Sequence, residues 1–249
     1  MTQAQGCYIE CVLIGARWVY KIRFDEIWHV NLLDKLLEHG LIIVSCNKNI
    51  SLDEFKIIGK KLGKPLIAKK HTLDDERHVQ YVSDKGLFSN DDVDWHNDWS
   101  YGEGNYFGTM LYNNKNGHLS TTDFIDMRKA YEDYPDKDFL HNTEGTYFPP
   151  QYLHETCFTP RMLKILEKAK VTRKFAHLHH ATGDHVIYIS PGTLQNDIDV
   201  NSIVKYCEQN IYEHNWKKND ILIYDNIRYM HRRHAFEGER ELWRTQFWI

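Results

Sequence analysis

The sequence predicts a mainly β fold, a barrel or sandwich of short strands with helices packed around it. Three observations support this prediction. Short apolar or alternating segments separated by turn residues dominate the second half of the chain. Amphipathic helical patterns lie before and between them. No internal repeat or compositional break divides the 249 residues, so we expect a single domain over residues 1–249.

The N-terminal part of the chain alternates strand and helix patterns. The expected elements are a hairpin at 7–24, a helix at 25–38, a strand at 41–46 and a helix at 52–62. The hairpin turns near Gly15, and Gly40 ends the first helix as a C-terminal cap. Ser51 followed by Glu54 has the pattern of a capping box, which opens the second helix.

Long polar loops separate the remaining elements. We expect strands at 79–82, 105–113, 119–124, 174–179, 185–190, 219–224 and 242–249, and helices at 126–133, 159–170 and 200–214. Apart from its one strand, the aspartate-rich stretch 66–104 is predicted to be a loop. Residues 135–160 are irregular and aromatic, and their length predicts either a surface meander or a lid over a substrate.

Charge and composition exclude several classes of protein. A net charge of −4, with 42% hydrophobic and 27% charged residues, predicts neither a nucleic-acid partner nor a membrane partner. The first residues lack the pattern of a signal peptide, and charged residues interrupt every apolar run. We therefore expect a cytoplasmic protein; a homo-oligomer is compatible with the sequence, which does not determine the oligomeric state.

A His-x-Asp pair and a second group of histidines suggest metal chemistry. His96 and Asp98 are two residues apart, and residues i and i+2 of an extended segment point the same way. The segment 224–234 offers His231 or His234 as a third ligand. Two histidines and one carboxylate on one face of an iron ion leave three positions open for a chelating co-substrate and oxygen. Alone, the pair is a weak signal that many proteins contain by chance.

Five segments together resemble the taurine and 2,4-dichlorophenoxyacetate dioxygenase (TauD/TfdA) family of Fe(II)- and 2-oxoglutarate-dependent oxygenases. They are the strand–helix unit at 36–65, Trp95-His96-Asn97-Asp98, Thr122-Asp-Phe124 with Ala130-Tyr131, HHATGDHVIYIS at 179–190, and Asp225-Asn226 before His231 with Arg240-Glu-Leu-Trp-Arg244. Two features depart from the family pattern. His180 stands where proline is usual, and the spacing from His231 to Arg240 is shorter than usual.

The resemblance implies a double-stranded β-helix (jelly-roll, cupin-like) core and a set of site residues. It assigns His96, Asp98 and His231 as iron ligands, and its spacing favours His231 over His234. It further implies that Thr122 and Arg240 hold the distal carboxylate of 2-oxoglutarate, a task that suits the planar fork of arginine. Arg244 then contacts an acidic substrate or assists Arg240. If the shorter spacing reflects another register, Arg244 is the co-substrate anchor instead.

The implied cofactors are Fe(II), 2-oxoglutarate and O₂. The implied reaction is oxidative decarboxylation of 2-oxoglutarate to succinate and CO₂, coupled to hydroxylation, desaturation or cleavage of a small polar metabolite. Related halogenases lack the carboxylate ligand, so Asp98 favours hydroxylation or an outcome that branches from it. Two rival hypotheses are a catalytically silent barrel that serves as a binding module, and a zinc hydrolase. The oxygenase is favoured because the sequence contains all five residues that the resemblance assigns to the metal and the co-substrate: His96, Asp98, His231, Thr122 and Arg240. The sequence does not identify the substrate.

Overall fold

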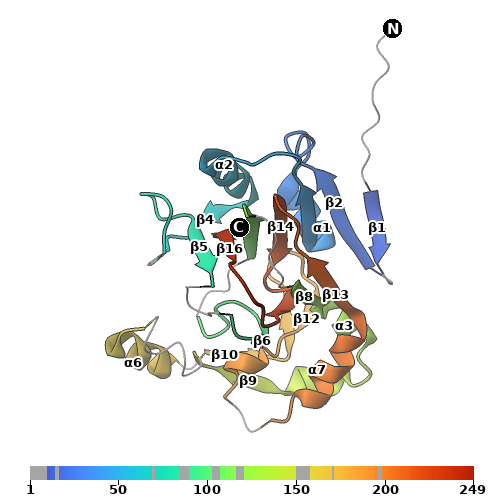
Figure 1. Cartoon of the computed structure of the whole chain (residues 1–249). Coiled ribbons are helices and arrows are strands. Elements are labelled where there is room, and N and C mark those ends of the chain that lie inside the picture. Colours follow the sequence, from blue (N-terminus) through green and yellow to red (C-terminus); the bar gives the residue numbers. More distant parts are fainter. Residues whose placement is uncertain are drawn as a thin grey trace.

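Two sheets that face one another form the centre of the protein, and helices cover their outer sides (Figure 1). The computed structural model describes residues 10–14, 17–68, 71–84, 90–102, 107–115, 121–149, 158–169, 171–195 and 198–249. This architecture confirms the prediction of a mainly β protein with a jelly-roll core and flanking helices.

The larger sheet has eight strands in the order β1-β2-β3-β14-β7-β16-β4, with β5 paired to β16. Its strands are β1 (Glu10–Ile14), β2 (Arg17–Arg23), β3 (Leu41–Ser45), β4 (Lys64–Pro65), β5 (Gln80–Ser83), β7 (Gly108–Asn113), β14 (Asp220–Asp225) and β16 (Glu241–Trp248). β1 and β2 form the predicted hairpin, and Gly15 lies outside the described residues. β2 and β3 are parallel, whereas the other neighbours are antiparallel.

The smaller sheet has four strands and carries much of the site described below. Its order is β13 (Ile211–Asn215), β8 (Thr121–Asp126), β15 (Tyr229–Arg233) and β6 (Val93–His96). Two short ribbons complete the strands: β9 (Glu144–Tyr147) with β10 (Val171–Lys174), and β11 (Ala176–Leu178) with β12 (His185–Ile187). The sequence predicted neither β6 nor β15.

The two faces of the larger sheet bury different clusters because side chains alternate along each strand. In β3, Ile42 and Val44 pack in a cluster with residues of α1 (Leu32–His39) and α2 (Leu52–Leu62). Leu41 and Ile43 of the same strand point the other way and pack with Phe124 of the smaller sheet. The second cluster is the apolar part of the barrel interior.

The remaining helices are α3 (Met127–Asp133), α4 (Lys137–Asn142), α6 (Pro160–Ala169) and α7 (Asn201–Cys207), with the short 3₁₀ helices η2 (Pro191–Thr193) and η3 (Glu208–Asn210). α2 has the predicted bounds and capping box, in which Ser51 and Glu54 exchange side-chain-to-backbone hydrogen bonds. α1 begins later than predicted because Asn31 caps it. It ends as predicted at Gly40, where φ is 74° and an added Cβ would lie 2.5 Å from Tyr229.

Two predicted segments differ in the structure. The helix expected at 200–214 ends at Cys207, and β13 follows it because His214 alternates into the barrel while its neighbours are more exposed. The segment 135–160, expected to be irregular, contains α4 and β9. Residues 150–157 lie outside the described part of the chain, so the lid prediction is not tested there.

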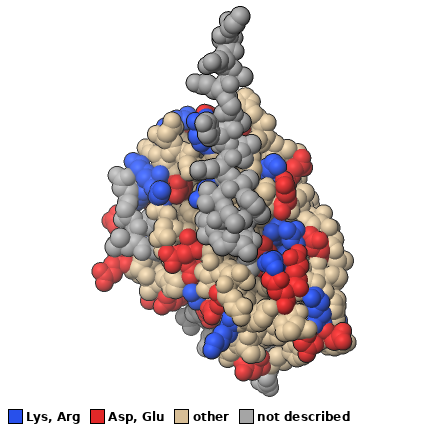
Figure 2. Space-filling model, turned by 90° about the vertical axis from the view of Figure 1, so that its right-hand side faces the viewer, with Lys and Arg blue, Asp and Glu red and all other residues tan. Residues whose placement is uncertain are grey.

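Acidic and basic side chains of the described residues are interspersed on the face shown in Figure 2. In the described parts of the chain, no helix has the length and apolar character needed to cross a membrane.

Candidate metal centre and co-substrate pocket

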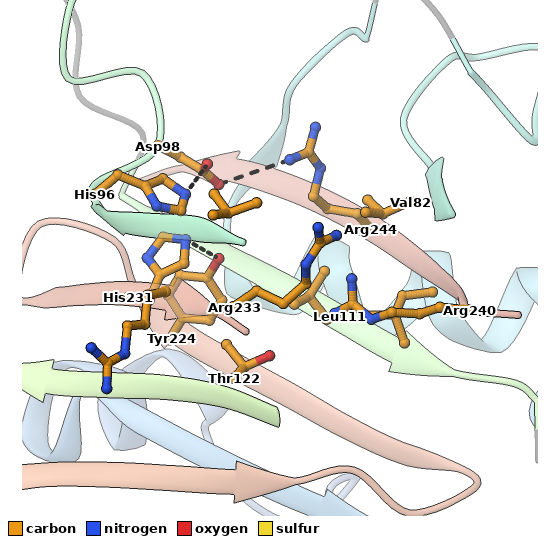
Figure 3. A pocket seen from close by; sticks show the side chains of 13 residues that line it. Val82, His96, Asp98, Leu111, Thr122, Tyr224, His231, Arg233, Arg240 and Arg244 are labelled. Atoms are coloured by element: carbon orange, nitrogen blue, oxygen red, sulfur yellow. Dashed lines mark hydrogen bonds and ion pairs between the residues drawn. The ribbon is translucent and has the colours of Figure 1, made fainter. Parts of the chain in front are cut away.

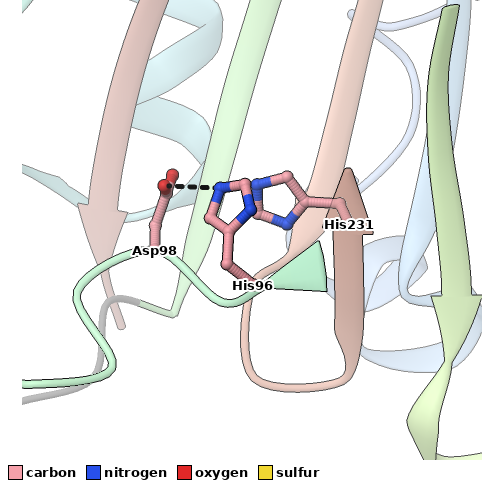
Figure 4. A group of neighbouring side chains, drawn as sticks. All are labelled: His96, Asp98 and His231. Carbon is pink, nitrogen blue, oxygen red and sulfur yellow. Dashed lines mark ion pairs between the residues drawn. The ribbon is translucent and has the colours of Figure 1, made fainter. Parts of the chain in front are cut away.

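His96 and His231 lie directly opposite one another on the antiparallel strands β6 and β15. Their ring centroids are 4.3 Å apart (Figure 4). The same two strands also pair Val93 with Arg233, so β6 contributes one more residue to this interval than β15 does. Such a bulge changes the direction of side chains along a strand. It allows both Val93 and His96 to face the cavity, although they are three residues apart.

Asp98 reaches the same point, but not by strand alternation as the sequence analysis assumed. β6 ends at His96, and Asp98 lies in the turn that follows. The side chain of Asn226 holds this turn: its Oδ1 accepts from the Asp98 backbone N–H at 2.9 Å, and its Nδ2 donates to the Asp98 carbonyl at 3.0 Å. The convergence of His96 and Asp98 is therefore a tertiary effect.

The Asp98 carboxylate has one oxygen engaged and one directed at the histidines. Gln246 Nε2 donates to Oδ2 at 2.9 Å, and Arg244 lies 3.9 Å from the same oxygen. Oδ1 lies 3.7 Å from His96 Nε2. Burial alone would raise the pKa of Asp98, but its surroundings, which include the Arg244 guanidinium and the hydrogen bond from Gln246, outweigh burial and lower the pKa. Asp98 is thus an anion with one oxygen turned toward the site.

Both imidazoles can present a lone pair. His96 Nδ1 lies 2.7 Å from the carbonyl oxygen of Asp94, which accepts hydrogen bonds only, so Nδ1 carries the proton and Nε2 is a free acceptor. Burial, and next the proximity of His96, lower the pKa of His231 to about 3, so this ring is neutral. One donor atom from each of His96, Asp98 and His231 lies within 4.8 Å of the others. This donor set fits a first-row divalent metal such as Fe(II).

The turn before β15 fixes the position of His231. Asp225 Oδ1 accepts from the backbone N–H groups of Ile227 and Arg228, and its Oδ2 lies 2.8 Å from Nε2 of the buried His179. Nδ1 of His179 accepts from two backbone N–H groups, so its Nε2 must be the donor to Asp225. Through this hydrogen bond to Asp225, the segment that contains His179 stabilises the turn that positions His231.

One cavity contains the triad together with Thr122, Arg240 and Arg244 (Figure 3). It encloses about 530 Å³ of empty space, counting its open mouth. The structure thus brings all six predicted site residues to a single place.

Arg240 and Thr122 lie at the part of this cavity formed by β8 and the start of β16. Arg240 is 4% exposed, and its guanidinium lies 5.7 Å from the ring centroid of Phe236. Burial, and next the charge of Arg233, lower its pKa to about 9. Thr122 Oγ1 accepts from the indole N–H of Trp216 at 3.0 Å, which leaves its own hydroxyl proton free to donate. Both residues offer donors to an anion.

Arg244 lies beside the triad, and not at the end of the cavity where Arg240 and Thr122 lie. It contacts Asp98 as described, and its NH2 donates to Gln80 Oε1 at 2.9 Å. Its side chain points into the cavity from β16 (Figure 3).

His234, the alternative third ligand, is turned away from the triad. Its Nε2 lies 2.8 Å from Asp123 Oδ2, which also accepts from Arg232. Arg232 in turn lies 4.5 Å from the ring centroid of Trp95 and pairs with Glu208. Arg233 is 7% exposed, and both Arg232 and Arg233 line the cavity.

A second group that could hold a metal among the described residues consists of Asp74, Glu76 and His78. Lys56 lies 3.1 Å from the Glu76 carboxylate and 3.4 Å from that of Asp74. Because Lys56 bridges the two carboxylates, the group is explained without a metal.

The sequence analysis did not predict that Gln246, Tyr224 and Arg233 belong to the site. It also did not predict that the Asn226 side chain holds the turn at Asp98. Tyr224 is 2% exposed, and its hydroxyl lies 3.3 Å from His231 Nε2. Only Asn226 carried a signal, through its position beside Asp225 shortly before His231. The contact of Gln246 with Asp98 spans 148 residues, whereas Tyr224 is seven residues from His231.

A jelly-roll core with two histidines and one carboxylate in an arginine-lined cavity defines a mononuclear non-haem metal enzyme. A family model described as taurine catabolism dioxygenase TauD, TfdA family matches residues 10–246, and the chain belongs to this family. It is an oxidoreductase, and enzymes of this family use Fe(II), 2-oxoglutarate and O₂.

Solved structures agree on the fold. A taurine dioxygenase from Burkholderia xenovorans shares 15% identity with a TM-score of 0.72, covering 96% of this chain and 89% of that chain. AAD-2 in complex with Mn(II) and N-oxalylglycine shares 16% identity with a TM-score of 0.74, covering 96% of both chains. A search of curated proteins gives no significant match.

Proposed function

We propose that this dioxygenase binds Fe(II) through His96, Asp98 and His231 and oxidises a small polar metabolite. The observation that carries the proposal is the single cavity in which the triad and three donors to an anion lie together. The complete ligand set argues against a catalytically silent barrel. A zinc hydrolase would leave Thr122 and Arg240 without a role.

We assign different residues of the cavity to the co-substrate and to the prime substrate. Arg240 and Thr122, at the end away from Asp98, hold the distal carboxylate of 2-oxoglutarate, which keeps its keto acid end toward the metal. Arg244, beside Asp98, is left to meet an acidic group of the prime substrate or to steady Asp98. These positions support Arg240, and not Arg244, as the residue that binds the distal carboxylate of 2-oxoglutarate.

The chemistry that Fe(II) supplies when bound is activation of O₂, which couples decarboxylation of 2-oxoglutarate to succinate and CO₂ with oxidation of the substrate. The protein holds the metal, orients the two organic substrates and excludes water. Asp98 occupies the carboxylate position, so we propose hydroxylation or an outcome that branches from it. A cytoplasmic location, the absence of nucleic-acid and membrane partners, the single domain and the oligomeric state stay predictions.

Two measurements test the proposal. Fe(II) and 2-oxoglutarate added to the purified protein under argon should give a weak visible charge-transfer band. A turnover screen for succinate against amino acids, sulfonates, sulfate esters and aryloxy acids should then identify the substrate class. If neither the band nor 2-oxoglutarate binding is observed with metal-loaded protein, the proposed function is wrong.

A further inference from the structure

A row of three polar side chains crosses the larger sheet beside the triad. Tyr224 of β14 is paired with Thr109 of β7, and Thr109 is paired in turn with Gln246 of β16. The chain neighbours of these residues pack with the helices on the outer side of the sheet, so the three side chains face the barrel interior. Because paired residues are direct neighbours across strands, Tyr224, Thr109 and Gln246 lie side by side.

Hydrogen bonds along this polar row connect one proposed ligand with another. Gln246 Nε2 donates to Asp98 Oδ2 at 2.9 Å and to Thr109 Oγ1 at 3.5 Å. Burial is the main cause of the raised pKa of Tyr224, and a side-chain hydrogen bond with Thr109 acts against it, as a donor to the phenol oxygen does. With Thr109 as its donor, the Tyr224 hydroxyl directs its own proton at His231 Nε2, 3.3 Å away. The polar row thus joins Asp98 to His231.

Metal binding removes the acceptor of the Tyr224 hydroxyl. Nε2 is the nitrogen of His231 on the side of the cavity, which Tyr224 also lines (Figure 3). A nitrogen whose lone pair binds a metal accepts no hydrogen bond. Tyr224 is 2% exposed, and a buried donor without an acceptor is unfavourable. Its hydroxyl therefore requires another acceptor when a metal is bound.

Tyr224 lies where β8 leads from the metal centre to the co-substrate pocket. Its ring centroid is 4.9 Å from that of His231 and 5.1 Å from that of Phe124. Phe124 lies opposite His231 in the pair of β8 with β15, and Thr122 is two residues away on the same face of β8. The keto acid end of 2-oxoglutarate, which faces the metal in the proposed function, offers oxygen atoms that accept hydrogen bonds at this place.

We propose that the Tyr224 hydroxyl donates a hydrogen bond to the keto acid group of 2-oxoglutarate, at the end of the co-substrate that faces the metal. This proposal rests on the proposed function and deepens it, because Thr122 and Arg240 are assigned to the opposite end. Its consequence is that Tyr224 contributes equally to the binding of any 2-oxo acid, whatever the group at the distal end.

Two 2-oxo acids separate the two ends of the co-substrate. Calorimetric titration of 2-oxoglutarate and of 2-oxovalerate, which has the same chain length but no distal carboxylate, into the Mn(II)-loaded protein measures binding without turnover. Tyr224→Phe should weaken the binding of both acids by the same factor, about 3- to 10-fold, the usual effect of one neutral hydrogen bond. Thr122→Ala should weaken the binding of 2-oxoglutarate alone.

Tyr112→Phe is the matched control. Tyr112 belongs to the same sheet but packs on its outer side, where its hydroxyl accepts from the Ile50 N–H at 3.1 Å and donates to Asn219 Oδ1 at 3.0 Å. This variant should bind both acids as the wild type does. The Mn(II) affinity of Tyr224→Phe is measured first and should not fall, because the phenol donates to the nitrogen that the metal needs. A loss of more than about threefold would mean that Tyr224 supports His231 instead, and would overturn the proposal.

The charge-transfer band of Fe(II) and 2-oxoglutarate under argon is a second readout. The band arises from transfer of an electron from iron to the keto acid group, and a hydrogen bond to that group lowers the energy of the accepting orbital. Tyr224→Phe should therefore shift the band to shorter wavelength, whereas Tyr112→Phe should leave it in place.

A Tyr224→Phe protein that folds, binds both acids as the wild type does and keeps the band in place overturns the role of Tyr224 alone. A loss for 2-oxoglutarate without a loss for 2-oxovalerate also overturns it, because Tyr224 would then act at the distal end. A wild-type protein that does not bind 2-oxoglutarate overturns the proposed function as well. Circular dichroism checks the fold of each variant. If Tyr224→Phe does not fold, Tyr224→Met and Tyr112→Met replace the two variants, and the same pattern is required of them.

Discussion

The side-chain amide of Asn226 pairs with both backbone groups of Asp98, at 2.9 and 3.0 Å. These two hydrogen bonds replace the backbone pairing that a neighbouring strand would provide, because β6 ends at His96, before Asp98. A further hydrogen bond joins the same two segments: Asn97 Nδ2 donates to the Asn226 carbonyl oxygen at 2.7 Å. Asp98 is thus held through its backbone by the turn that precedes His231, and this turn couples the positions of Asp98 and His231.

Loss of this clamp should weaken metal binding without removing any ligand. Asn226→Ala should lower the affinity for Mn(II) by about 10- to 100-fold, the usual effect of removing a group that orients a ligand. Titration of the metal into the variant measures it. Asn215→Ala, at an exposed position on β13, is the control and should bind the metal as the wild type does. Unchanged affinity in Asn226→Ala would mean that the turn holds Asp98 by other contacts.

The third ligand can be tested by two histidine variants. His231→Ala should abolish binding of one metal ion per chain and succinate formation, while the fold persists because the residue lines an open cavity. His234→Ala should keep both, because His234 contacts Asp123 and not the triad. Metal content after dialysis and succinate release are the measurements. The reverse pattern would transfer the ligand role to His234.

The sequence predicted the three residues that the structure brings together at the proposed metal site, but not the strands that carry two of them. β15 places His231 and Arg233 inside a barrel, so it lacks the apolar alternation by which a strand is recognised. β6 is short and contains a bulge, which breaks the period of two. His96 and Asp98 do lie close together, but strand alternation, from which their proximity was predicted, is not the reason. Asn226, 128 residues away, sets the direction of Asp98.

Long-range contacts also explain the error about the helix expected at 200–214. The pattern at 200–214 is apolar enough for one helix, yet His214 is needed inside the barrel beside Trp216, at 4.7 Å between ring centroids. Local signals with a fixed chemistry were reliable: the capping box of α2 and the glycine cap of α1 occur as predicted.

Acid should destabilise the protein through His177, which is distant from the metal ligands in sequence. Burial, and next the charge of Arg173, lower its pKa to about 4. The unfolded chain, with an ordinary histidine pKa near 6.5, binds more protons than the folded chain between these values. The free energy of unfolding should therefore fall by about 2–3 kcal/mol as the pH decreases from 7 to 4.

Urea unfolding of the metal-free protein across this pH range measures the effect. His177→Gln should reduce the dependence by most of that amount, because glutamine does not titrate. His29→Gln, at an exposed position, should leave it unchanged. Equal slopes for wild type and His177→Gln would show that His177 is not held neutral in the folded state.

The roles of Arg240 and Arg244 give the last prediction. Loss of one partner from a buried, hydrogen-bonded charge pair costs about 2–5 kcal/mol. Arg240→Ala should therefore weaken 2-oxoglutarate binding by tens- to thousands-fold. Thr122→Ala should lose much less, since it removes a single neutral donor. Arg244→Ala should act chiefly on an acidic prime substrate, because Arg244 lies beside Asp98 and away from the proposed carboxylate site.

Anaerobic calorimetric titration of 2-oxoglutarate into the three metal-loaded variants separates these roles. Arg244→Ala could also disturb Asp98, so metal affinity is measured first and titrations use saturating metal. Under that condition, a large loss of 2-oxoglutarate affinity in Arg244→Ala with almost none in Arg240→Ala would exchange the two assignments.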